Sequence, residues 1–269
     1  MQWQTKMTAL ATAVCLASLG GCAYKHPVPT ANVGYINPNN LPKIGSVQAV
    51  SPIRQQALTQ AATSLGARGA LAFRSRHIDQ QLTAQSSYLD DIFNFNRLLL
   101  TNNVLPPVIV EDDNDINLDN NDTIRTSEKV YKIESKARFV SVPPTWRDYL
   151  WMSYQKPSMP NQSLLPTNKQ EADIWNAAFK NGWSQGLVQA NDIFAVNLNR
   201  LKRDYLGILL YRKLLAQGMI SSPSISKADL GITGDANELR IHDQVSRITA
   251  DSALQTNSNK WQPVITNTK

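Results

Sequence analysis

The longest periodic stretch of the sequence, residues 168–217, constrains the fold more than any other feature. Steps of mostly three or four residues separate the positions of one series, most of them apolar or small: Trp175, Phe179, Gly182, Gly186, Ala190, Ile193, Asn197, Leu201, Tyr205 and Ile208. This spacing places them on one face of an α-helix of about 45 residues, or about 65 Å. Thr167-Asn168-Lys169-Gln170 fits a capping box at its start, and Gly218 is its natural end. The pattern predicts a helix that is the spine of a domain or an element of an assembly.

The part of the chain before this helix is also predicted to be helical. Ser51 and Pro52 suit an N-cap and a first turn. Residues 53–80 predict one or two helices, with possible breaks at Gly66 and Gly69, and a second helical stretch follows over 81–99. The small residues of the first stretch would let another element approach closely.

The middle of the chain predicts strands. The β-branched run 108–110 passes into an acidic stretch, which we interpret as a solvated loop. It does not fit a calcium-binding loop, because Leu118 stands where the turn needs Gly and Ile124 where Glu should be. Residues 129–133 and 137–142 predict adjacent antiparallel strands of one sheet, and residues 239–248 predict another strand or hairpin.

An aromatic segment over 146–154 predicts a short helix after Pro143-Pro144, capped by Thr145. We interpret its aromatic side chains as part of the core, with a surface that binds a partner as the alternative. They are Trp146, Tyr149, Trp151 and Tyr154. Trp175, Phe179 and Trp183 likewise indicate core first and a helix-docking site second. The fold class predicted is α+β, with a helical N-terminal part, a small antiparallel sheet and one long central helix.

The N-terminus predicts a secretory signal over residues 1–21. Its apolar run, residues 7–21, is too short to span a bilayer and follows a single positive charge at Lys6. It ends in Leu19-Gly20-Gly21-Cys22, which resembles the lipobox of bacterial lipoproteins, and Cys22 is therefore the predicted lipidation site. An ordinary cleavage site with a chance cysteine nearby is the alternative.

Three further regions are predicted after the signal. Residues 22–51 would be the acylated cysteine, carrying chains such as palmitate, and a flexible Pro/Asn-rich tether. Residues 52–254 would form a single α+β domain, and 255–269 a polar tail. If Cys15 leaves with the signal and Cys22 carries lipid, the mature chain has no free thiol and no disulfide.

The sequence contains no catalytic or metal-binding constellation. The three histidines, His26, His77 and His242, are not spaced as metal ligands. There is no Gly-x-Ser-x-Gly elbow, Walker loop or dinucleotide fingerprint. The net charge of +6 includes no Lys/Arg block for nucleic acid. We therefore expect no enzyme, no cofactor, no metal and no direct nucleic acid contact.

Four parts of the sequence together resemble one family. They are the Cys22 lipobox, "FNFNRLLLTNNVLPPVIVE", "ARFVSVPPTWRDYLW" and "WNAAFKNGWSQGLVQANDIF". This combination resembles the DotC family, whose relatives include the TraI lipoproteins of IncI-type conjugative plasmids, over residues 51–250.

The resemblance implies a structural lipoprotein of the outer-membrane core complex in a type IVB secretion or conjugation apparatus. It further implies contacts with a DotD-like lipoprotein and a DotH-like subunit, a place in a hetero-oligomeric ring, and no catalytic role. Ala23 stands after the cysteine, where an Asp tends to retain such lipoproteins in the inner membrane, so the expected location is the periplasmic face of the outer membrane. The alternatives are a peptidoglycan-binding or cell-wall-remodelling periplasmic lipoprotein and a small-ligand-binding lipoprotein.

Overall fold

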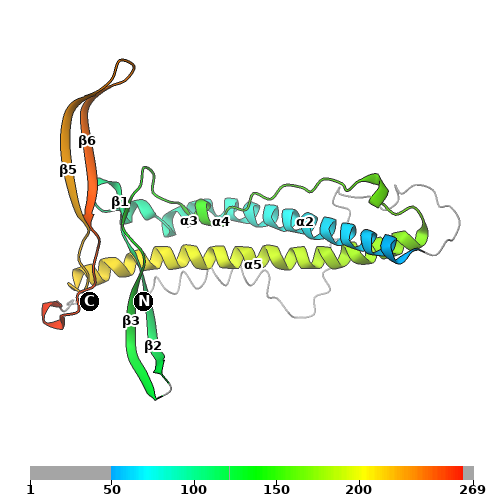
Figure 1. Ribbon diagram of the computed structural model, residues 1–269, viewed down its shortest axis with the longest axis horizontal. Coiled ribbons are helices and arrows are strands. Elements are labelled where there is room, and N and C mark those ends of the chain that lie inside the picture. The colour runs from blue at the N-terminus through cyan, green and yellow to red at the C-terminus, as the bar shows by residue number, and fades with distance from the viewer. Residues whose placement is uncertain (1–49, 121, 263–269) are drawn as a thin grey trace. The chain divides into compact units, whose positions relative to one another are not determined.

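The computed structural model describes residues 50–120 and 122–262 and has the predicted α+β class (Figure 1). The chain divides into two compact units. In the described range, the first unit contains residues 50–62 and 160–178, and the second contains 63–159 and 179–262. Cys22, His26 and the predicted signal and tether lie outside the described residues, apart from the last two positions of the tether. The predicted region boundaries remain predictions.

Two long helices supply most of the helical residues. Helix α2 covers Pro52–Ala84 and α5 covers Lys169–Ala216, which confirms the 168–217 periodicity. The predicted breaks at Gly66 and Gly69 are wrong, because α2 continues through both. Among the described residues, no helix combines the length and apolar character needed to cross a membrane.

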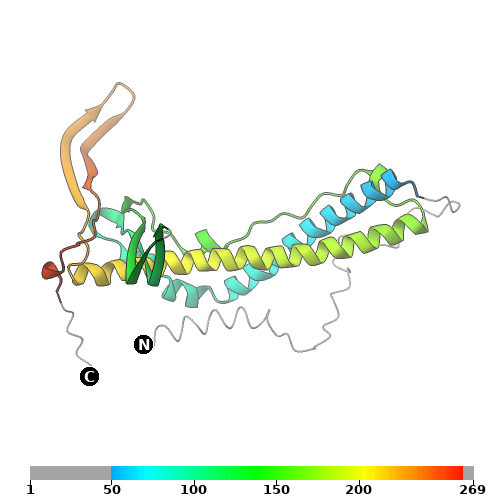
Figure 2. The same cartoon turned by 60° about the horizontal axis from the view of Figure 1, so that its bottom comes forward.

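Within the second unit, α2 and α5 lie side by side at very close range (Figures 1 and 2). A Cβ added to Gly66 would lie 3.0 Å from the Trp183 backbone nitrogen, and one added to Gly182 would lie 2.8 Å from the Thr63 carbonyl carbon. Gly186 is equally constrained, with the Ala70 Cβ at 2.8 Å. These glycines therefore allow the two backbones to approach, as the small residues predicted.

The helical stretch predicted over 81–99 is divided into three pieces. Helix α2 ends at Ala84, α3 covers Ser86–Ile92, and a 3-10 helix covers Phe95–Leu98. The backbone turns at each junction so that Leu89, Phe95 and Leu98 are all buried. Further short elements are α4 at Trp146–Leu150 and 3-10 helices at Thr101–Asn103, Gln162–Leu164 and Ser258–Lys260.

Within residues 50–120 and 122–262, three two-stranded antiparallel sheets take the place of the one small antiparallel sheet that was predicted. Strand β1 (Val104–Leu105) pairs with β4 (Arg138–Phe139), β2 (Val108–Asn120) with β3 (Thr123–Ser135), and β5 (Ser224–Gly234) with β6 (Leu239–Ala250). The expectation that 129–133 and 137–142 are neighbours in one sheet is therefore wrong, while the hairpin around 239–248 is confirmed.

The acidic stretch is strand β2 and not a loop. Its carboxylates face lysines of β3: Glu111 accepts a hydrogen bond from Lys129, and Asp112 lies 3.1 Å from the Lys132 ammonium. Opposite charges on paired strands stabilise a ribbon that has little apolar surface to bury. The hydrophobic alternation that normally indicates a strand is weak here for the same reason.

Both ends of α5 are closed by local hydrogen bonds. Gly218 has a φ of +67°, and its N–H and that of Met219 donate to the carbonyls of Leu215 and Leu214 (3.1 and 2.9 Å), which confirms the predicted stop. The predicted capping box is displaced by one residue: Asn168 caps the helix, accepting a bond from the Glu171 N–H at 2.8 Å.

Candidate protein interaction surfaces

The β2–β3 hairpin is fixed at its base to the core of the second unit. Ile109 is 1% exposed and packs in a cluster with Tyr211, Leu214 and Ile220. Gly207 of α5 lies where the hairpin crosses the helix, since a Cβ there would be 2.5 Å from the Val108 Cγ1. The base of the hairpin is therefore held by side-chain packing against α5.

The distal half of the same hairpin has no such cover. Ile116, Leu118 and Ile124 are 69%, 68% and 63% exposed. Leu118 pairs with Ile124 across the strands, and Ile116 is two residues before Leu118, so the three side chains share one face. We call these three residues the β2–β3 trio.

The β5–β6 hairpin has a trio of the same composition. Ile232 pairs with Ile241, and Leu239 is two residues before Ile241. Their exposed fractions are 70% for Ile232, 65% for Ile241 and 68% for Leu239. We call these three residues the β5–β6 trio. An isolated two-stranded hairpin is only marginally stable in water, and exposed apolar patches on such ribbons are typical of surfaces that another protein covers.

The predicted aromatic segment divides between core and surface. Trp146 is buried, and its Nε1–H donates to Asp90 Oδ1 at 2.7 Å. Arg147 pairs with the same carboxylate, and these two donors, Arg147 first, lower the pKa of Asp90. Trp151 and Tyr154 are 47% and 40% exposed. The core interpretation is thus confirmed for Trp146, whereas Trp151 and Tyr154 lie on the surface.

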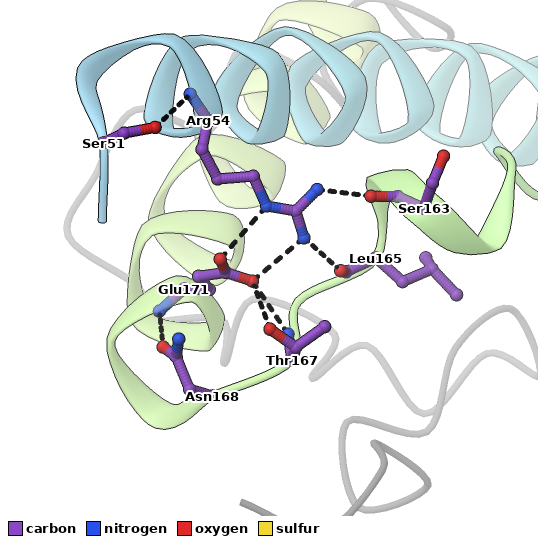
Figure 3. Close-up of polar contacts among 7 residues, drawn as sticks. All are labelled: Ser51, Arg54, Ser163, Leu165, Thr167, Asn168 and Glu171. Atoms are coloured by element: carbon purple, nitrogen blue, oxygen red, sulfur yellow. Dashed lines mark hydrogen bonds and ion pairs between the residues drawn. The ribbon is translucent and has the colours of Figure 1, made fainter. Parts of the chain in front are cut away.

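A partly buried ion pair stands in the first unit, between the start of α2 and the start of α5 (Figure 3). Arg54 donates to both oxygens of Glu171 at 3.0 Å and to the backbone carbonyls of Ser163 and Leu165. The Glu171 carboxylate also accepts from the N–H and hydroxyl of Thr167 at 2.8 and 3.0 Å.

The hydrogen bonds from Arg54 are the main reason that the pKa of Glu171 falls to about 2. The guanidinium and the carboxylate both bind groups within the first unit. The pair therefore holds the start of α2 to the start of α5 and is not directed at a ligand. We interpret it as a structural clasp.

The histidines of the described chain do not meet. His77 lies exposed on α2 beside Gln81, and His242 lies exposed in β6 with a φ of +58°. Over residues 50–120 and 122–262, no group of three or more His, Cys, Asp or Glu side chains is arranged to hold a metal ion.

The two trios were not predicted from the sequence. The signal available was the Ile-x-Leu alternation at 116–118 and the Leu-x-Ile alternation at 239–241. Alternation marks one face of a strand but does not tell whether that face is buried.

Over the described residues the chain is an α+β protein with two long helices and two long hairpins that expose apolar side chains. The sequence profile of the family described as "Type IV secretory system, conjugal DNA-protein transfer" matches residues 52–263. The chain belongs to this DotC/TraI-type family, and it is a component of a type IV secretion or conjugal transfer apparatus. A comparison with curated protein sequences gave no match.

Proposed function

We propose that the chain is a structural lipoprotein subunit of the outer-membrane core complex of a type IVB secretion or conjugal transfer apparatus. It acts by contact with other apparatus proteins and catalyses no reaction. Membership of the family supports the apparatus, and the lipobox at Cys22 supports the anchor.

The observation that carries the proposal is the pair of exposed apolar trios. Each hairpin has its strands paired along 11 to 13 residues, yet each exposes three large aliphatic side chains to 63–70%. Interfaces place such side chains at their buried centre. A subunit with two patches of this kind can bind two neighbours at once, which is what a core complex requires of its parts.

The test is copurification from cells that carry the whole apparatus. The chain, tagged at its C-terminus, is extracted from membranes in mild detergent and captured. We expect a DotD-like lipoprotein and a DotH-like subunit in the eluate. An unrelated outer-membrane lipoprotein with the same tag is the matched control. Capture of neither partner, with the tagged chain present and membrane-bound, would reject the proposal.

The proposed lack of catalytic activity is tested by a separate measurement. Purified protein is incubated with isolated cell-wall sacculi and run on a gel containing them. We expect neither sedimentation with the sacculi nor a cleared zone. A cleared zone would show a cell-wall-cleaving enzyme instead.

A further inference from the structure

The β2–β3 hairpin differs in charge from the rest of the chain. Residues 108–135 contain eight acidic and three basic side chains, a net charge of −5, whereas the whole chain has a net charge of +6. The remainder therefore carries +11. An acidic arm on a basic protein is attracted to other copies of the same protein.

The apolar trio of this hairpin lies next to part of that acidic charge. Glu128 is exposed and stands four residues after Ile124 in β3. Because side chains alternate along a strand, residues an even number apart share a face, so Glu128 and the trio face the same way. On this face the hairpin thus presents three aliphatic side chains and the carboxylate of Glu128.

This chemistry excludes two kinds of partner. A ribbon with a net charge of −5 is repelled by nucleic acid phosphates and by anionic lipids. Asp122 lies in the turn beside the trio, so inserting the trio into a bilayer would carry a carboxylate with it. A protein surface that is both apolar and basic remains.

The second unit itself has such a surface, on α5. Val196, Arg200, Arg203 and Leu206 follow one another at steps of four, three and three residues, and they therefore occupy one face of the helix. All four are exposed, Val196 to 65% and Leu206 to 44%. Between residues 193 and 217, α5 and its end carry five basic side chains and one acidic one.

The two arginines of this face are held in position while they remain exposed. The Arg200 guanidinium lies 5.3 Å from the centre of the Tyr149 ring. Arg203 lies 2.9 Å from Asp204 and 3.2 Å from Glu134. Side chains that are already ordered lose less conformational entropy when a partner binds.

We propose that the β2–β3 trio of one copy packs on the Val196–Leu206 face of α5 in a second copy, with Glu128 of the hairpin beside Arg200 and Arg203. We call the hairpin trio the donor surface and the α5 face the acceptor surface. Because these two surfaces are different, the contact is heterologous and joins copies head to tail, as in a ring or a filament. The contact requires neither the lipid anchor nor any other apparatus protein.

The experiment uses two tagged forms of the full chain, coexpressed without the rest of the apparatus and extracted in excess detergent. One tag is captured and the other is measured. The donor variant is Ile116→Thr/Leu118→Thr/Ile124→Thr, and the acceptor variant is Val196→Ser/Arg200→Glu. The control variant, Ile232→Thr/Leu239→Thr/Ile241→Thr, alters the matched trio of the other hairpin.

A head-to-tail contact gives a distinctive pattern. Wild-type copies and control copies should capture each other, and capture should fall at least fivefold as salt rises from about 50 to about 500 mM. Donor variant with donor variant, and acceptor with acceptor, should lose capture. Donor with acceptor variant should retain it, because one intact hairpin still meets one intact helix face.

Other results would overturn the inference. They are no capture between wild-type copies, equal capture in the donor–donor pair, and loss in the control pair. Binding of the wild-type chain, but not the donor variant, to vesicles of phosphatidylethanolamine and phosphatidylglycerol would assign the trio to lipid instead. These outcomes are independent of copurification with DotD-like or DotH-like proteins, so this inference and the proposed function can fail separately.

Discussion

At the scale of single residues, the approach of α2 to α5 depends on glycine at particular positions. Gly182 lies against the Thr63 backbone, so that a Cβ would overlap the Thr63 carbonyl. Gly69 belongs to the same pair of helices, but a Cβ there would meet only the Trp183 ring edge at 3.4 Å, an ordinary contact distance. Alanine substitution at the two positions therefore separates two effects on the free energy of unfolding, the cost of steric overlap and the gain in helix propensity.

We expect Gly182→Ala to lower the free energy of unfolding by about 1–3 kcal/mol, since overpacking forces the backbones apart. Gly69→Ala should leave it unchanged or raise it by up to about 1 kcal/mol, because Ala favours the helix. Urea unfolding of both variants, followed by circular dichroism, measures the difference. Equal effects at the two positions would contradict the close approach at Gly182.

The Arg54–Glu171 clasp predicts a dependence of stability on pH. The pKa of Glu171 in the folded chain is about 2, below its ordinary value of 4.5. The ionised carboxylate therefore stabilises the fold fully above about pH 4.5, and this contribution is lost as the pH falls from there toward 2.

We expect the loss attributable to Glu171 to be roughly 1–3 kcal/mol, allowing for solvent near the pair. Glu171→Gln should lower stability at neutral pH and give a flatter decline on acidification than the wild type. Urea unfolding at a series of pH values between about 6 and 3 measures this. An unchanged slope in Glu171→Gln would rule out the clasp as its source.

At the scale of elements, the β2–β3 hairpin consists of a buried base and an exposed end. Ile109 at the base of β2 is 1% exposed, whereas Ile116 in the same strand is 69% exposed. We expect Ile109→Ala to cost about 2–5 kcal/mol of unfolding free energy and Ile116→Ala less than about 0.5 kcal/mol. Thermal unfolding of the two variants in dilute protein is the measurement. Similar costs would mean that the hairpin end is packed in solution.

The same elements show what the sequence could predict. The 3.6-residue period of α5 is visible because one face of that helix is buried along much of its length, at Trp183, Ala190, Leu201, Tyr205 and Ile208 among others. The sequence predicts a loop where β2 lies because the strand buries neither face beyond Ile109, so the apolar alternation is limited to Ile116 and Leu118. Its pairing instead depends on contacts with residues about 18–20 positions later, which a single stretch of sequence does not reveal.

The trios escape sequence-based prediction for a related reason. Ile116 and Ile241 are of a residue type that is usually buried in a core. Only the register of each hairpin shows that they share an exposed face with their neighbours. The family, in contrast, is predicted from "PPTWRDYLW", which includes the capped start of α4 and the buried Trp146. Tight packing restricts which residues a segment can contain, so such a segment is recognisable from its sequence. An exposed surface restricts its residues much less.

At the scale of the whole molecule, the proposed function depends on the anchor at Cys22. Each buried CH₂ of an acyl chain contributes about 0.8 kcal/mol, and stable membrane attachment needs more than one chain. A diacylglycerol on the Cys22 sulfur, with a further acyl group on its amine, would meet that requirement. The exposed trios would then act at a membrane surface, where the local concentration of partner proteins is high.

We expect Cys22→Ser to release the protein from the membrane fraction and to abolish incorporation of labelled palmitate. Cys15→Ser is the matched control, because Cys15 lies before the predicted cleavage site and should leave with the signal; this variant should remain membrane-bound and labelled. Fractionation of cells on a density gradient, with labelling in parallel, measures both. A Cys22→Ser chain that stays in the outer membrane fraction with unchanged processing would show that the lipobox is not used. A labelled Cys22→Ser chain would place the acyl chains elsewhere.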